Sequence, residues 1–149
     1  MRRNAIRWAT LLGLAVVLCG LVGCGGPSVE FVASDAAYTS AQTQLVLERT
    51  DTSRFEDEPT SEAIALRSEA LAQLRSQGEA AARAADLITD TFPPKTRSVP
   101  TYVESAVVDG VPSYLIIEAW GPAEGALDRK RLWVIDAETG DVLFSAAAR

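Results

Sequence analysis

Residues 99–120 decide the fold, and they read VPTYVESAVVDGVPSYLIIEAW. Two runs rich in β-branched and aromatic residues, Val99–Val108 and Val111–Trp120, flank the dipeptide Asp109-Gly110. Such runs favour β-strands, and an Asp-Gly pair between them is the strongest short-range sequence signal for a tight hairpin turn. The stretch therefore predicts two antiparallel strands joined by a two-residue loop.

The length of that loop also sets the register between the two strands. With two residues in the turn, Val108 faces Val111 and Tyr102 faces Ile117. A slip of one residue would move every side chain to the opposite face of the sheet, so the register decides which residues form the core.

Two further strands are expected after a loop over Gly121–Asp128, at Arg129–Asp136 and Asp141–Ala146. The turn between them, Ala137–Gly140, ends in a glycine that can supply positive φ. Because each strand follows the previous one after a short connection, the four strands predict an antiparallel meander.

Both faces of the last hairpin are apolar. Alternation places one set of large side chains on one face (Trp133, Ile135, Val142 and Phe144) and a second set on the other (Leu132, Val134 and Leu143). One helix cannot cover two faces. The second face is therefore covered either by an additional N-terminal helix or by a partner or second subunit.

Upstream of the sheet, the sequence predicts a long helix that begins at Thr60 or Ser61 and ends before Pro93-Pro94. Its apolar stripe recurs at steps of three, four or seven residues, at Ile64, Leu71, Leu74, Gly78, Ala81, Ala85 and Ile88. The small residues in the middle favour close packing on the sheet. A coiled coil with a partner helix is the alternative.

A shorter helix is expected at residues 35–49, capped by Ser34 and presenting Tyr38, Ala41 and Leu45 on one face. A strand over residues 44–49 is the competing interpretation. Together the segments predict a single α+β domain over residues 34–149. In it, one or two N-terminal helices pack on a four-stranded antiparallel meander sheet.

The chain begins with the three segments of an export signal. Arg2, Arg3 and Arg7 supply positive charge, Trp8–Leu21 is apolar, and the segment ends in Leu21-Val22-Gly23-Cys24. This ending resembles the lipobox of bacterial lipoprotein precursors, in which a cysteine directly follows the cleavage site. Its thiolate is the nucleophile that lipid attachment requires.

The lipobox resemblance implies that Cys24 receives a diacylglycerol thioether, that the chain is cut before it, and that the new amino group is acylated, for example with palmitate. Residues 1–23 are then the signal peptide, and residues 24–33 are the lipidated cysteine and a flexible spacer. The expected partner is membrane lipid, and the expected location is the cell envelope, with the lipid-anchored domain facing outside the cytoplasm.

Two alternatives to the lipobox stay open. Trp8–Cys24 spans 17 residues, which is the short limit for a transmembrane helix. An ordinary cleaved signal would instead release the domain without an anchor.

The final hairpin also resembles a known family. Residues 132–143, LWVIDAETGDVL, are similar to the end of a PepSY domain, in which a strand, an Asp-x-x-Thr-Gly turn and a second strand recur. Blades of quinoprotein-type propellers contain a similar sequence motif. The PepSY resemblance implies a binding or inhibitory domain of an envelope protein, and it assigns no functional residue.

Composition excludes several classes of function. Three of the 14 basic residues precede Cys24 and all 20 acidic residues follow it, so the chain from Cys24 onward has a net charge of −9. A chain with this negative charge repels the phosphate backbone, so binding to nucleic acid is disfavoured. There is no histidine, which excludes histidine-based catalysis and the usual zinc sites. Cys19 leaves with the signal and Cys24 is acylated, so no disulfide, metal or other cofactor is expected.

The remaining candidate residues are aromatic, acidic or basic. Tyr114, Trp120 and Trp133 form a possible ligand or partner surface, although aromatic residues at strand spacing more often belong to the core. Three carboxylates, Glu104, Glu118 and Asp136, are candidates for a catalytic pair. The basic run Asp128-Arg129-Lys130-Arg131 could bind an anion or guard a strand edge.

These observations favour a non-catalytic, lipid-anchored binding or interaction module of the cell envelope, with an envelope protein as a candidate partner. One alternative is a structural lipoprotein that self-associates through the long helix or a spare sheet face. The other is an envelope hydrolase that uses carboxylates alone.

Overall fold

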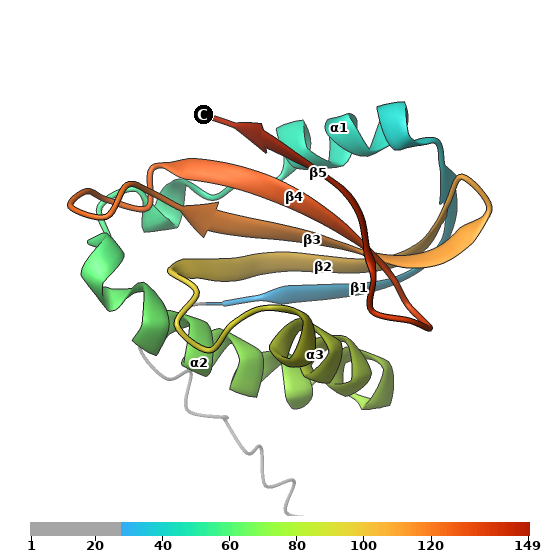
Figure 1. Ribbon diagram of the computed structural model, residues 1–149, viewed down its shortest axis with the longest axis horizontal. Coiled ribbons are helices and arrows are strands. Elements are labelled where there is room, and N and C mark those ends of the chain that lie inside the picture. The colour runs from blue at the N-terminus through green and yellow to red at the C-terminus, as the bar shows by residue number, and fades with distance from the viewer. Residues whose placement is uncertain (1–27) are drawn as a thin grey trace, which may run out of the picture.

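The computed structural model describes residues 28–149. The predicted signal peptide, the lipobox and the first residues of the spacer lie outside the described residues. The described chain forms three layers, with α1 on one face of a central sheet and α2 and α3 on the other face (Figure 1). The predicted α+β class is confirmed, whereas the number and direction of the strands differ from the prediction.

The sheet has five strands in chain order, which are β1 (Glu30–Tyr38), β2 (Ser98–Val108), β3 (Val111–Trp120), β4 (Arg129–Asp136) and β5 (Val142–Ala148). The helices are α1 (Ser40–Arg49), α2 (Ala63–Arg75) and α3 (Glu79–Thr91), with short 3₁₀ turns at Ser53–Phe55 and Thr60–Glu62. The four predicted strands are present, and the sequence prediction missed β1.

The central hairpin forms as predicted. β2 and β3 pair so that Val108 faces Val111 and Tyr102 faces Ile117. Asp109 and Gly110 take φ values of 48° and 85° in the turn. Two consecutive residues with positive φ are typical of a type I′ turn, whose twist matches that of the two paired strands.

β1 corrects the prediction of a purely antiparallel four-stranded sheet. It pairs with β2 in parallel, whereas the other three strand pairs are antiparallel. Its residues were divided between the predicted spacer and the predicted helix. Its segment contains alanine and aspartate, which favour strands weakly, so it becomes a strand through pairing with β2 and not through local preference.

The start of β1 is also held by side chains of α2 and of the turn that follows it. Gln73 accepts a hydrogen bond from the main-chain N–H of Val29, and Gln77 donates to the carbonyl of Val29 and accepts from the N–H of Phe31. These amides satisfy main-chain groups at the start of an edge strand, so the fold begins before residue 34.

The predicted helix start at residue 35 is wrong. Ser34 accepts a backbone hydrogen bond from Ala36, but it does so within a register irregularity of β1. Thr39 is the actual N-cap of α1, and it forms a reciprocal capping box with Gln42. A serine that hydrogen-bonds two residues ahead is compatible with either local structure, so the sequence did not distinguish them.

α1 covers the sheet face opposite to α2 and α3, which the predicted long helix could not cover as well. Its buried residues are Thr43, Val46 and Leu47, whereas Leu45, expected on the apolar face, is 61% exposed. The competing strand over residues 44–49 is wrong, because these residues continue the helix. The second apolar face of the sheet is thus buried within this chain, as one of the two alternatives predicted.

The predicted single long helix is divided at Gly78. This residue has a φ of 120°, which cannot belong to a right-handed helix, and α3 begins directly after it. α2 and α3 then pack together on the same face of the sheet (Figure 1). The division rules out the continuous helix that the coiled-coil alternative required.

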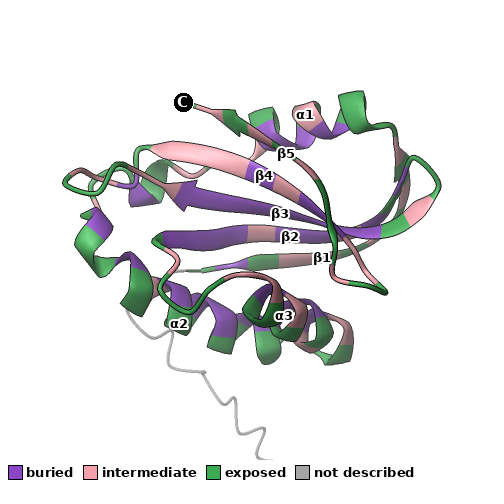
Figure 2. Ribbon diagram, in the orientation of Figure 1, coloured by how far each residue is buried: buried purple, intermediate pink, exposed green. Residues whose placement is uncertain are grey.

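Two cores result, one on each side of the sheet. Figure 2 shows buried residues along β2 and β3 and on the sheet-facing sides of the helices. One prediction for β5 is wrong, because Phe144 pairs with Val134 and packs with it against α1, opposite to the face of Ile135. A register shift in this hairpin moves Phe144 to that face.

Within residues 28–149, none of the helices combines the length and the apolar character that crossing a bilayer requires.

Candidate functional site

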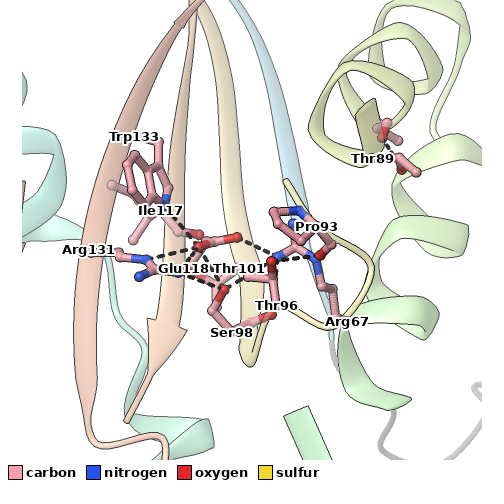
Figure 3. A network of polar contacts seen from close by, with 11 residues as sticks. Arg67, Thr89, Pro93, Thr96, Ser98, Thr101, Ile117, Glu118, Arg131 and Trp133 are labelled. Carbon is pink, nitrogen blue, oxygen red and sulfur yellow. Dashed lines mark hydrogen bonds and ion pairs between the residues drawn. The ribbon is translucent and has the colours of Figure 1, made fainter. Parts of the chain in front are cut away.

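A buried ionic cluster lies between the sheet and α2, and we call it the Glu118 cluster. Glu118 is completely buried, and its Oε1 accepts a hydrogen bond of 2.5 Å from Nη1 of Arg67. Its Oε2 accepts from both Nε and Nη2 of Arg131, at 3.1 Å each, and from the hydroxyl of Ser98 at 2.8 Å. Trp133 completes the cluster by donating Nε1–H to Oε2 at 3.0 Å (Figure 3).

Local sequence patterns place these groups on one face. Glu118 is two residues after Ile116 on β3, so it points toward α2 and α3. Arg131 is its direct cross-strand partner on β4. Arg67 follows Ala63 by four residues and precedes Leu71 by four, which puts it on the buried side of α2.

The charges of the Glu118 cluster do not cancel. Two guanidinium groups, from Arg67 and Arg131, surround one carboxylate. Burial disfavours the ionised carboxylate, but Arg67, Arg131 and the donated hydrogen bonds more than offset it and hold the pKa of Glu118 below its usual value. Glu118 is therefore an anion at neutral pH, and the cluster has one excess positive charge.

A cavity of about 310 Å³ adjoins the Glu118 cluster, between α2, the end of α3 and the segment after it. Its apolar wall is formed by Ile64, Leu71, Phe92, Pro93 and Pro94. Its polar groups come from Arg67, Ser68, Arg75 and Thr89. An apolar cavity of this size with a few polar groups is typical of a small-molecule site.

Arg67 joins the ionic cluster to the cavity. Its side chain is 6% exposed, and its Nη1 also contacts the carbonyl of Ser98 at 3.2 Å. Among the residues that the structure describes, its buried Nη2 has no hydrogen-bond partner. The ring of Phe92 lies 5.7 Å from the guanidinium carbon. This contact compensates a buried cation only partly, because N–H donors prefer an acceptor oxygen.

The three predicted aromatic site residues lie on this same face of the sheet. Trp133 is partly buried, bonds to Glu118 and packs against Phe92 with 5.1 Å between ring centroids. Tyr114 is 8% exposed and belongs to the core. The ring of Trp120 has guanidinium groups within 6 Å, from Arg129 and Arg131. Trp120 and Trp133 contact groups of the cluster, whereas Tyr114 is a core residue, so the three do not form one open stacking surface.

The predicted carboxylate pair does not assemble. Glu104 and its cross-strand partner Leu115 belong to the α1 side of the sheet, whereas Glu118 belongs to the α2 side. Asp136 instead accepts hydrogen bonds from the main chain of Glu138 and Thr139 in the last turn. The three carboxylates therefore act at separate places in the structure.

Glu104 is the centre of a second polar cluster, beneath α1. It is 2% exposed and accepts hydrogen bonds from the hydroxyls of Tyr38 at 3.0 Å and Tyr102 at 2.8 Å, and from Nη2 of Arg49 at 3.3 Å. Burial, together with the bond to Glu104, raises the pKa of Tyr102 to about 12. All groups of this cluster have partners in the fold, which fits a structural role.

The basic run at residues 128–131 is used inside the fold. Arg131 belongs to the Glu118 cluster, and Nζ of Lys130 donates to the carbonyls of Glu48 and Thr50 at 3.0 Å each. Arg129 lies 3.7 Å from the carboxylate of Asp128. These contacts engage Lys130 and Arg131, whereas the buried Nε of Arg129 has no hydrogen-bond partner among the described residues.

A larger cavity, of about 430 Å³, lies elsewhere, next to Ser28 and the end of α1. Its two arginines are already engaged. Arg54 donates to the hydroxyl and carbonyl of Ser28, and Arg49 donates to Glu104. The smaller cavity at Arg67 is therefore the better candidate site.

Sequence reasoning missed Arg67 and Ser98. The apolar stripe predicted for the helix omits Arg67, although the spacing of Arg67 from Leu71 and Leu74 puts it on the same, buried side. The predicted register of the hairpin already determined on which face of its strand Glu118 lies. An acidic residue on the inward face of a buried strand requires a cation, and the nearest buried arginine could have been sought on that basis.

Within the part of the chain that the structure describes, no group of three or more acidic, histidine or cysteine side chains could hold a metal ion. Comparison with protein-family models, curated protein sequences and solved structures finds no significant match for this chain. The PepSY resemblance of the last hairpin stays a prediction, and the chemistry of the Arg67 cavity must be argued from its own residues.

Proposed function

We propose that this chain is a lipid-anchored lipoprotein of the cell envelope whose domain binds a ligand without catalysing a reaction. The observation that carries the binding function is the apolar cavity beside a buried arginine whose Nη2 has no acceptor among the described residues. The anchored location is supported by the sequence Leu21-Val22-Gly23-Cys24, with its preceding apolar and basic segments.

Two observations favour binding over hydrolysis by carboxylates. Glu104 and Glu118 lie on opposite faces of the sheet, and cationic and hydroxyl donors occupy both side chains. A glycosidase-type reaction requires two carboxylates that face one substrate from about 5 to 10 Å apart. The sheet separates the two buried acids of this domain.

Anchorage is tested by lipid labelling of the full chain in a bacterial host. Cys24→Ala should abolish incorporation of a palmitate analogue and release the domain from the membrane fraction or block its maturation. Cys19→Ala is the matched control, because it also removes a cysteine near the apolar run but leaves the lipobox intact. Equal labelling of both variants would refute an anchor at Cys24.

Binding is tested by cross-linking in the native envelope, with the anchored protein compared with the Cys24→Ala form. A partner that is enriched with the anchored form, and that cross-links through the cavity rim at Ile64, would identify an envelope protein as the ligand. Recovery of lipid alone would exclude a stable protein partner and leave a small molecule as the ligand.

A structural, self-associating role is the second candidate, favoured by β5. Val142–Ala148 contains no charged residue and pairs with β4 alone among the described strands. An uncharged edge strand can pair with another chain. Sedimentation should then show concentration-dependent dimers that Ala147→Lys removes, and a monomer at high concentration would exclude this role.

A further inference from the structure

We propose that the cavity beside Arg67 binds a small organic carboxylate, with the carboxylate on Arg67 and a compact apolar body against Leu71 and Pro93. The inference rests on the proposed binding function and specifies its ligand. It follows from three separate observations, which concern charge, hydrogen bonding and cavity shape.

The local charge favours a single negative charge. The Glu118 cluster has two cations and one anion, and Arg75 on the cavity wall is already paired with Asp86 at 2.9 Å. One positive charge therefore remains without a counterion, in a domain whose net charge is strongly negative. A monoanion would neutralise it.

The hydrogen-bonding geometry favours a carboxylate. Nη2 of Arg67 has no acceptor among the described residues, while Nη1 is bound to Glu118 and Ser98. A planar guanidinium and a carboxylate match in shape, and the charged pair forms stronger hydrogen bonds than neutral partners do. The hydroxyl of Ser68, which lines the same cavity, is available as a second donor.

The cavity wall favours an apolar ligand body over inorganic phosphate. Leu71, Phe92, Pro93 and Pro94 supply most of the wall, and the cavity of about 310 Å³ has room for a small molecule only. A phosphate dianion would lose its hydration against this wall without receiving enough donors in return. An aryl or short alkyl carboxylate instead buries its body there.

Phe92 controls access to Arg67. Its ring covers the guanidinium and also contacts Trp133. A carboxylate that reaches Nη2 displaces this ring and takes over the space beside Arg67. Binding should therefore change the fluorescence of Trp133. This signal gives a second measure of binding, independent of the calorimetric titration.

The test uses calorimetric titration of the full chain in non-ionic detergent with phenylacetate, phenylacetamide and inorganic phosphate. Phenylacetate should bind in the millimolar range or better, and phenylacetamide, of the same shape but neutral, should bind about tenfold more weakly. Phosphate should not bind at the cavity. Equal binding of phenylacetate and phenylacetamide, stronger binding of phosphate, or no binding of phenylacetate would each overturn the proposal.

Replacement of Arg67 would combine a loss of binding with a loss of folding, since Arg67 also neutralises Glu118. The decisive variants are therefore at Ile64, which lines the cavity and is 41% exposed. Ile64→Glu should weaken phenylacetate binding about fivefold relative to the matched Ile64→Gln, because a carboxylate at the rim repels an anion. Equal affinities of the two variants would place the binding elsewhere.

This experiment can fail separately from the proposed function. Lipid labelling at Cys24 without phenylacetate binding would refute the ligand class and leave the anchored binding module standing. Phenylacetate binding without lipid labelling would refute the anchored location and leave the ligand class standing.

Discussion

Glu118 is completely buried, and a charged group without access to water must be neutralised by its neighbours. Arg67 and Arg131 provide this neutralisation from two different elements, α2 and β4. The cluster therefore ties α2 to the sheet through directed polar contacts, in addition to the apolar packing around it.

Replacing Glu118 by glutamine should reduce the free energy of unfolding by about 3 kcal/mol or more at pH 7, because the buried Arg67 and the partly buried Arg131 lose their anion. Glu104→Gln is the control, and it should cost less because the partner Arg49 is 56% exposed. Urea unfolding measures both. A Glu118→Gln variant within about 1 kcal/mol of the wild type would contradict this account of the cluster.

The same substitution predicts a pH dependence. The fold lowers the pKa of Glu118 below its unfolded value, so its stabilisation is complete above about pH 4.5 and is lost as the pH falls through the lower folded pKa. The stability difference between wild type and Glu118→Gln should therefore shrink in acid. A difference that grows below pH 4.5 would contradict the sign of the shift.

At the scale of the elements, Gly78 converts one predicted helix into two. The apolar spacing continues across it, which is why the sequence favours a single helix. The positive φ at Gly78 instead turns the chain, so that α3 packs beside α2 and both cover the same sheet face.

Gly78→Ala distinguishes these two structures by the sign of its effect. In a continuous helix, alanine would stabilise by about 1 kcal/mol. At a φ of 120° it should destabilise by about 1 kcal/mol or more, because the side chain strains the backbone although no atom lies close enough to clash with it. Chemical unfolding measures whether Gly78→Ala raises or lowers the free energy of unfolding.

Ala65→Gly calibrates that measurement, because Ala65 is an exposed residue inside α2 and should show the ordinary cost of about 1 kcal/mol for glycine in a helix. Stabilisation by Gly78→Ala would show that the chain forms one helix.

At the scale of the whole molecule, the sheet separates two cores that meet only through its strands. Ile116 faces the α2 and α3 side, while the next residue, Ile117, faces α1. Both sides are buried, which explains why β3 reads as an almost continuous apolar run and not as an alternating one.

Separate cores should respond independently to mutation. Ile88→Val on the α3 side and Ile117→Val on the α1 side should each cost about 0.5 to 1.5 kcal/mol, and the double variant should be additive within about 0.5 kcal/mol. Ile117 and Leu132, which are cross-strand partners in one core, provide the comparison and should couple. Strong coupling across the sheet would show that the layers do not act separately.

The sequence by itself determined the features that depend on near neighbours. The Asp109-Gly110 turn fixed the hairpin and its register, because only a few turn types connect two strands with a two-residue loop. The bend at Pro93-Pro94 ended the helical region for a similarly local reason. The apolar faces of β4 also predicted that the sheet needed cover on both sides.

Only the tertiary structure decided the features that depend on residues far apart in the chain. β1 becomes a strand through pairing with β2 about 70 residues later, and its own residues give little local preference. The cavity at Arg67 likewise exists only when α2, the end of α3 and the segment after α3 come together. Contacts between distant segments, and not local preferences, determine where the buried charges of this protein find their partners.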